Sequence, residues 1–304
     1  MRIFQADAAE RLRTVVFATD FSDASVNAGL YARALARRMH ASLVVMHAFY
    51  LEQGALEAEV FSKLLSQQRV HLRQRIEEAA SELTSDGHVT EALLTEGDPR
   101  IIVPQVAAER QPSLIVMGTH GGGAMERFVL GSTAEGILRH TKIPALSIGP
   151  RTPLLDAETL ELKRILFVTN NAAGAASTAQ LALDVAAAFG AALDVLNIIH
   201  PKSVEGTLNE PHELYARHAE TEAALPEHAH EHVELRTFVS VGQPRTEILK
   251  HLREREIDLL VMSLNAETQL EMQGNLSGAF PIIADAVCPV LTQVAMTPAE
   301  TETH

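Results

Sequence analysis

We expect an α/β protein made of two tandem copies of a five-stranded parallel domain. Two observations lead to this prediction. Apolar segments of strand length alternate with helix-like segments along the chain, which is typical of a parallel sheet covered by helices on both faces. The chain also repeats itself at a spacing of about 150 residues, which is close to the usual size of a domain.

The repeat consists of four segments of the first half that return in the same order in the second half. Residues 14–19, 97–101, 114–117 and 143–146 return as residues 164–169, 242–246, 259–262 and 288–291. The last three segments share an offset of 145 residues and the first has an offset of 150, so the second copy lacks five residues in between. We therefore predict a first domain at residues 1–150, a linker at 151–162, a second domain at 163–295 and a disordered polar tail at 296–304.

The elements of the first copy follow from its patterns. Short apolar runs rich in β-branched residues predict strands at residues 14–19, 43–49, 89–95, 113–117 and 144–148. Apolar residues at helical spacing predict helices at residues 23–39, 56–85, from 99 onward, and 132–140. We expect Ser22 to cap the first helix and Asp98 to cap the third, which opens with Pro99. The second copy repeats this order from residue 163 to 294.

The net charge of −14 is unevenly shared between the two copies. Residues 1–151 carry 16 basic and 17 acidic side chains, whereas residues 152–304 carry 9 basic and 22 acidic ones. A nucleic-acid-binding domain needs an excess of positive charge to neutralise phosphates. We therefore expect no nucleic-acid partner, and the difference in charge suggests that the two copies differ in function.

The composition predicts a cytoplasmic protein that does not enter a membrane. No apolar run approaches the length of about 18 residues that a transmembrane helix needs, and the first residues lack the apolar core of a signal peptide. Cys288 is the only cysteine of the sequence, so an intramolecular disulfide cannot form. Because Cys288 precedes a proline at a strand start, we expect a core residue rather than a nucleophile.

A glycine motif follows the fourth strand of the first copy. Gly118 ends the apolar run, and Gly121 follows after two intervening residues. After nine more residues, Gly131 leads into Ser132 and Thr133 at a helix start. Such a loop directs backbone N–H groups and a helix N-terminus at one point, which suits a phosphate. Glycines allow a close approach of the backbone and positive φ angles. The sequence therefore predicts an anion site in the first copy.

Together with the strand end at residues 18–22 and the Gly97-Asp98-Pro99 segment, this motif resembles the universal stress protein family, and the resemblance covers both halves. It implies a tandem member with two Rossmann-like, adenine nucleotide alpha hydrolase-like sheets. It also implies adenine nucleotide (ATP, AMP or ADP) bound at the carboxyl ends of the strands, with magnesium held by Asp20 as an open question. The implied nucleotide contacts are Ala18, Thr19, Asp20, Ala48, Met117, Gly118, His120, Gly121, Gly131, Ser132 and Thr133. Family members often carry Arg or Lys where Gly122 stands, and Arg127 could supply that charge instead.

The second copy lacks this motif. At the matching offsets Gly118 becomes Ser263, Gly121 becomes Ala266, Gly131 becomes Leu276 and Asp20 becomes Asn170. We therefore expect no nucleotide of this kind in the second domain. That domain does hold a histidine group, whose members are His212, His218, His228, His230 and His232. This group could bind zinc or could be a solvated loop.

Three functions remain open at this stage. The first is a stress-response protein that binds adenine nucleotide, with at most slow ATP hydrolysis, for which Asp20 and His120 are the only candidate bases. The second is a non-nucleotide interaction module with a vestigial glycine loop, whose protein partner is unknown. A ligase of similar fold is disfavoured, because the first strand is not followed by a pyrophosphatase loop.

An association of the two sheets is also expected. The last strand of each copy, opened by Pro144 and Pro289, would be an exposed edge in an isolated sheet. We predict that these strands pair antiparallel into an intramolecular pseudo-dimer, with Leu146 close to Leu291. A further homodimer of whole chains stays open.

Overall fold

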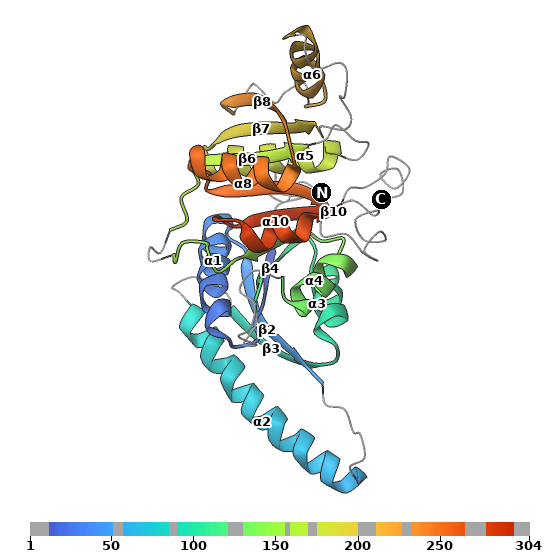
Figure 1. The fold of residues 1–304 in the computed structure, drawn as a ribbon. Helices are drawn as coiled ribbons and strands as arrows, with labels where there is room; N and C mark the ends of the chain where they lie inside the picture. The colour runs from blue at the N-terminus through green and yellow to red at the C-terminus, as the bar shows by residue number, and fades with distance from the viewer. Residues whose placement is uncertain are drawn as a thin grey trace.

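The computed structural model describes residues 12–50, 57–84, 90–120, 130–155, 159–169, 175–199, 211–226, 233–264 and 278–294. These residues form one continuous ten-stranded sheet with helices on both faces (Figure 1). The strands are β1 (Thr14–Ala18), β2 (Ser42–Phe49), β3 (Thr90–Glu96), β4 (Ser113–Gly118), β5 (Ala145–Ile148), β6 (Arg164–Thr169), β7 (Ala192–Ile199), β8 (Leu235–Val241), β9 (Leu259–Leu264) and β10 (Val290–Val294).

The described helices alternate with the strands, as expected. They are α1 (Asp23–Met39), α2 (Ala58–Leu83), α3 (Pro99–Glu109), α4 (Ser132–His140), α5 (Ala175–Phe189), α6 (Pro211–Ala223), α8 (Pro244–Glu254) and α10 (Ala279–Asp285). The bounds in the first copy agree with the predicted ones to within two residues, and α1 and α4 agree at both ends. The α/β fold class is therefore confirmed.

The strand order is β3-β2-β1-β4-β5-β10-β9-β6-β7-β8. All neighbours within each half run parallel, and the two halves meet where β5 pairs with β10 in the antiparallel sense. At this seam Leu146 is directly opposite Leu291. The prediction that the last strands pair and bring these two leucines together is confirmed.

The hydrophobic core consists of two layers, one on each face of the sheet. Alternate residues of each strand enter different layers, as Phe17 and Val16 of β1 do. Helices α1, α2 and α5 cover one layer, whereas α3, α4, α8 and α10 cover the other. Each layer runs across the seam and includes residues of both copies. The two copies therefore share their core.

The start of the linker is bound to both halves. Asn27 of α1 donates from Nδ2 to the carbonyl of Pro153 at 3.1 Å and accepts from the N–H of Leu155 at 3.1 Å. Arg151 forms an ion pair with Asp285 of α10 at 3.2 Å. Arg245 of α8 binds the same carboxylate from the other copy's side. This buried carboxylate therefore ties the linker to the second copy.

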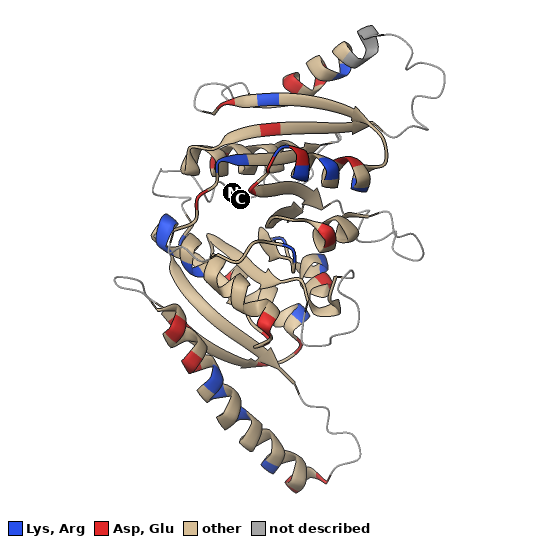
Figure 2. Ribbon diagram, turned by 60° about the vertical axis from the view of Figure 1, so that its left-hand side comes forward, with Lys and Arg blue, Asp and Glu red and all other residues tan. Residues whose placement is uncertain are grey.

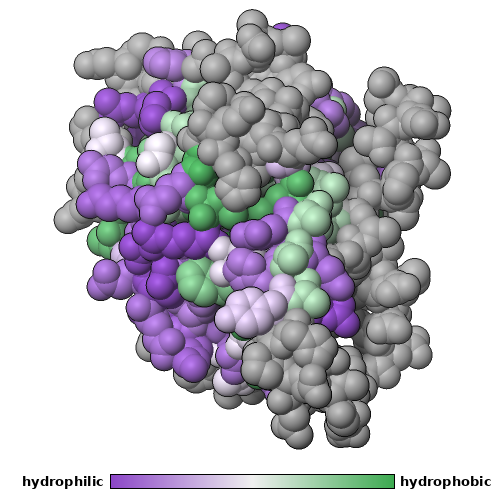
Figure 3. Space-filling model, turned by 90° about the horizontal axis from the view of Figure 1, so that it is seen from above, coloured by the Kyte–Doolittle hydropathy of each residue, from purple (hydrophilic) through white to green (hydrophobic). Residues whose placement is uncertain are grey.

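The surface of the molecule is mostly polar, and one long helix projects from it. Charged residues lie mainly on helices and at strand ends rather than along the central strands (Figure 2). Helix α2 projects from the body, and of its 26 residues only Leu72, Ile76, Ala80 and Leu83 are buried (Figure 1). From above, hydrophilic side chains cover much of the described surface, with an apolar band across the middle (Figure 3). Among the described helices, none is both long and apolar enough to cross a membrane.

The seam generates a first prediction. Leu146 and Leu291 are only 4% and 1% exposed, so replacing both with Glu places two like charges opposite each other in the core. Because a buried unpaired charge costs several kcal/mol, we expect the two halves to separate and unfold in two calorimetric transitions instead of one. Leu154→Glu is the control, since Leu154 is 67% exposed. A single transition in the double variant, with an unchanged midpoint, would contradict this account.

Candidate nucleotide site

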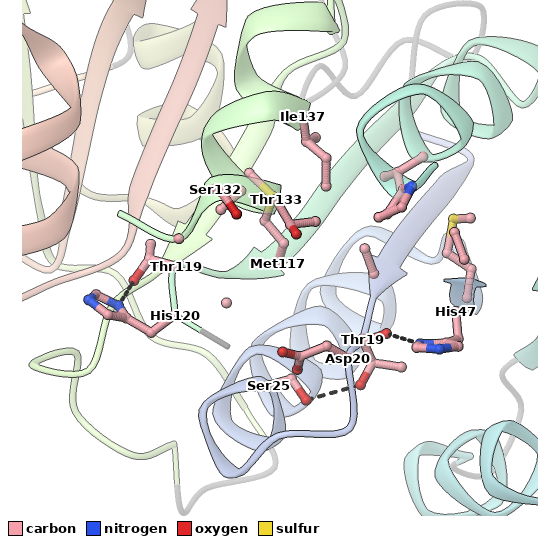
Figure 4. A pocket seen from close by; sticks show the side chains of 18 residues that line it. Thr19, Asp20, Ser25, His47, Met117, Thr119, His120, Ser132, Thr133 and Ile137 are labelled. Carbon is pink, nitrogen blue, oxygen red and sulfur yellow. Dashed lines mark hydrogen bonds between the residues drawn. The ribbon is translucent and has the colours of Figure 1, made fainter. Parts of the chain in front are cut away.

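A pocket of about 380 Å³ opens at the carboxyl ends of β1, β2 and β4. The strand order reverses direction between β1 and β4, which is where open α/β sheets usually bind ligands. In Figure 4, Ser132 and Thr133 of α4 face Asp20 and Ser25. A cavity of this size is within the usual range for small-molecule sites.

The pocket brings together ten of the eleven predicted contact residues. These are Ala18, Thr19, Asp20, Ala48, Met117, Gly118, His120, Gly131, Ser132 and Thr133. Gly121, with Gly122 and Arg127, lies outside the described residues. Sequence reasoning did not assign Ser25, Met46, His47, Pro99, Val103, Thr119, Ala134 and Ile137 to the site, although they also line it.

The N-terminus of α4 forms one wall of the pocket. Gly131 is its N-cap residue; the Gly131 N–H donates to the carbonyl of Thr119 at 2.8 Å, and its own carbonyl accepts from Glu135 N–H at 2.9 Å. The first N–H groups of the helix have no acceptor within it, so they can meet an anion. Gly131 has φ −60° and ψ 141°, which other residues adopt easily. Positive φ is therefore not what requires glycine at this position, and only close approach can require it there.

Gly118, at the end of β4, lies close to the start of α1. A Cβ atom at Gly118 would be 3.3 Å from the carbonyl oxygen of Ala24, which is tighter than an ordinary contact. Glycine therefore lets the strand end and the helix start approach each other around the pocket. The second copy has Ser263 at the equivalent place on β9.

The β1–α1 loop, residues 19–22, forms the opposite wall. Oδ1 of Asp20 accepts from the N–H of Ser22 at 3.0 Å and from its hydroxyl at 2.5 Å. Ser22 is the N-cap residue of α1, as predicted, but its side chain binds Asp20 and makes no capping bond. The Thr19 hydroxyl lies 3.0 Å from that of Ser25 and accepts from the N–H of Phe21 at 3.0 Å. The loop is therefore held by its own polar side chains.

His47 of β2 lines the pocket beside this loop and is half-buried. Its Nδ1 is 2.7 Å from the carbonyl oxygen of Thr19, which can only accept, so Nδ1 carries the proton. Burial lowers the pKa of His47; the hydrogen bond to the Thr19 carbonyl and the charge of Asp20 offset part of this effect, and the nearby Arg75 adds to it. The ring is therefore neutral at physiological pH, with Nε2 as an acceptor. A histidine near a strand end is more often a core residue than a ligand contact, so the sequence did not mark His47 as a site residue. Its position directly before Ala48, a predicted contact, was the signal that it lines the pocket.

The remaining wall is apolar. Met46, Val103 and Ile137 are at most 2% exposed and present hydrocarbon to the pocket. Such a surface suits the flat ring of a base, whereas the loop and the α4 N-terminus suit polar groups. On the polar side, His120 Nδ1 lies 2.7 Å from the Thr119 hydroxyl. Among the lining residues that the structure describes, none is Lys or Arg.

The equivalent region of the second copy is built differently. Asn197 stands where the first copy has His47, and its Nδ2 donates to the hydroxyl of Thr221 on α6 at 2.8 Å. The helix equivalent to α4 is α10, which has only seven residues. Asn170, Ala266 and Leu276 lie outside the described residues.

The zinc prediction for the histidine group stays untested, whereas the prediction for Cys288 is confirmed. His218 Nε2 lies 3.1 Å from the carbonyl of Thr237, while His228, His230 and His232 lie outside the described residues, as does the side chain of His212. No cluster of metal-binding side chains occurs in the described part of the chain, so zinc binding by this group stays a prediction. Cys288 is 3% exposed and burial raises its pKa to about 12, which confirms a core residue.

Comparisons with family models and with known proteins agree on one family. The model of the universal stress protein family matches residues 11–148 and again residues 161–291. A universal stress protein of Thermus aquaticus is 31% identical over 136 residues, covering 45% of this chain and 98% of that protein. One of Methanocaldococcus jannaschii is 29% identical over 143 residues, covering 45% of this chain and 81% of that protein.

A solved structure resembles the whole chain rather than one half. The crystal structure of a universal stress protein from Archaeoglobus fulgidus superposes with a TM-score of 0.67 at 18% identity. It covers 97% of this chain and 98% of that one. At this identity the likeness concerns the fold alone, and it supports the tandem arrangement.

His47 generates a prediction about pH. Because its pKa is lower in the folded chain than in the unfolded chain, the unfolded chain binds more protons as the solution is acidified. Its contribution to stability is complete above the unfolded pKa and is lost as the pH falls from neutrality to below that pKa. We expect His47→Asn to reduce the fall in melting temperature over this range. His71→Asn, at an exposed position of α2, is the control, and an equal fall in wild type and His47→Asn would exclude His47 as the source.

Proposed function

The chain belongs to the universal stress protein family, and on this premise we propose that its first domain binds one adenine nucleotide: ATP, ADP or AMP. The second domain serves as a partner that binds no such nucleotide. In this proposal the protein acts in the stress response of the cytoplasm. Any ATP hydrolysis is at most slow in this proposal, because Asp20, one of the two candidate bases, is assigned to holding a cation rather than to activating water.

The observation that carries the proposal is the composition of the pocket. Ten residues implied by the family motif line one cavity at the point where the strand order reverses. The free N–H groups of α4 and the hydroxyls of Ser132 and Thr133 suit phosphate oxygens. The apolar wall formed by Met46, Val103 and Ile137 suits the base, with the backbone of Ala48 available to its polar edge.

Asp20 is the candidate for holding magnesium on the phosphates. Both of its described hydrogen bonds fall on Oδ1, and the side chain is exposed at the pocket, so Oδ2 is available to a cation. Carboxylate and phosphate oxygens are the ligands that Mg²⁺ prefers. A bound cation would also offset the repulsion between Asp20 and the phosphates.

A second candidate function is a non-nucleotide interaction module. The observation in its favour is that no described lining residue is Lys or Arg, although a triphosphate carries several negative charges. Calorimetric titration with ATP, ADP and AMP separates the two functions. One nucleotide per chain supports the nucleotide site, and no heat with any of the three supports the module.

Gly131→Val tests the phosphate wall. Valine adopts the backbone angles of Gly131 without strain, so the substitution adds a branched side chain at the approach to the α4 N–H groups without unfolding the helix start. We expect affinity for ATP and AMP to fall at least about tenfold, or about 1.4 kcal/mol. Gly278→Val is a matched control, since Gly278 is the N-cap residue of α10 in the second copy. Unchanged affinity in Gly131→Val, or two nucleotides per wild-type chain, would contradict the single site.

Asp20→Asn tests the cation. Asparagine keeps an Oδ1 that accepts from Ser22 but removes the negative charge. If Asp20 holds magnesium, the substitution weakens ATP binding more in magnesium than in EDTA, by about tenfold for one lost carboxylate ligand. Asp23→Asn, an exposed carboxylate in the first turn of α1, is the control. Equal effects in both buffers would remove Asp20 from any metal role.

A further inference from the structure

We propose that Arg75, Phe21 and His47 form a positioning network that fixes the β1–α1 loop and makes nucleotide affinity depend on helix α2. The inference rests on the proposed nucleotide site, because it concerns the loop that carries Asp20. None of the three side chains belongs to the glycine motif. They come from α2, the loop and β2, and only His47 lines the pocket itself.

The contacts form a continuous path from α2 to the pocket. The guanidinium carbon of Arg75 lies 4.2 Å from the centre of the Phe21 ring, a distance typical of a cation–π contact. The Phe21 ring centre lies 4.5 Å from that of His47, with 37° between the ring planes. His47 Nδ1 then donates to the Thr19 carbonyl at 2.7 Å. The path therefore ends on the backbone of the residue before Asp20.

The loop needs such support because of the conformation of Phe21. Its φ is +60°, a region that L-residues with bulky side chains rarely adopt and that costs about 1 kcal/mol or more. Among the described residues, the other non-glycine positions with positive φ are His40 and Glu256. Both of these follow the C-termini of helices, where this conformation is common. Phe21 instead stands before a helix, in the loop that forms the pocket wall, where the Thr19 hydroxyl binds its N–H and Arg75 and His47 contact its ring.

The second copy shows what the strand end does without this network. Asn197 stands at the position of His47, and its amide donates to the hydroxyl of Thr221 on α6. An amide nitrogen of Asn occupies nearly the position of an imidazole Nδ1, whereas that of Gln reaches the position of Nε2. In the first copy an Asn at position 47 can therefore keep the bond to Thr19, and a Gln cannot. A comparison of the Asn and Gln variants therefore distinguishes an effect of the hydrogen bond from an effect of side-chain volume.

The test compares nucleotide affinity in five variants of the full chain by calorimetric titration with AMP. His47→Leu and His47→Gln remove the bond to Thr19, and we expect affinity to fall about tenfold. His47→Asn keeps the donor and should recover most of that loss. Arg75→Met removes the cation but keeps an unbranched side chain, and we expect a fall of about threefold. Arg73→Met, at an exposed position two residues away on the same helix, is the matched control and should bind as wild type does.

A second readout does not depend on nucleotide. Nitrogen-15 NMR of the histidine rings should find the proton of His47 on Nδ1, and Arg75→Met should shift the signals of the Phe21 amide and the His47 ring. Far-UV circular dichroism checks that each variant is folded. A proton on Nε2, or wild-type affinity in both His47→Leu and Arg75→Met, would overturn the inference while leaving the nucleotide site intact. A wild-type chain that binds no nucleotide would instead refute the proposed function, and the inference with it.

Discussion

The antiparallel pairing of β5 with β10 is the contact on which the rest of the structure depends. Two separate five-stranded sheets would expose four edges, and the seam removes the two that are apolar. The outer edges, β3 and β8, carry charges instead: Glu91 pairs with Arg110, and Glu234 pairs with Arg236. Charged edges resist pairing with other chains. The duplication therefore places this edge-to-edge contact inside one chain.

The seam also supports the pocket. The N–H of Thr119, a lining residue, donates to the carbonyl of Ile148 at the end of β5 at 3.0 Å. Gly149 follows directly and lies close to the carbonyl oxygens of Ile283 and Ala286 in the second copy, so that a Cβ there would be 3.7 Å from each. The second domain thus lies behind the wall of the first domain's site. The second domain therefore contributes to the pocket of the first domain by supporting this wall.

Patterns among residues close in sequence predicted the fold well. Features that depend on contacts between residues distant in sequence were not predicted. The bounds of α1 follow from Ser22 and from apolar spacing, and the pairing of the last strands follows from their prolines and exposed edges. The glycine motif predicted the wall made by the end of β4 and the start of α4, because these are neighbours along the chain. The contacts at Ala18, Thr19, Asp20 and Ala48 followed only from the family resemblance. The role of His47 was not predicted from the sequence, because it depends on a hydrogen bond to Thr19, 28 residues away along the chain. The positive φ angle of Phe21 was not predicted either, because phenylalanine as a residue type does not indicate this conformation.

A comparison of the two copies separates residues that serve the fold from residues that serve the site. Gly97 and Gly242 both persist, and a Cβ at either would come within 2.7 Å of a side chain in the following helix. Gly118 and Gly131 line the pocket and have become Ser263 and Leu276 in the second copy. The second copy still folds into the same five strands in the same order. The strand order therefore does not depend on these two glycines. Gly118 serves the close approach of β4 to α1 in the first copy, and both glycines border the pocket that we propose to bind nucleotide.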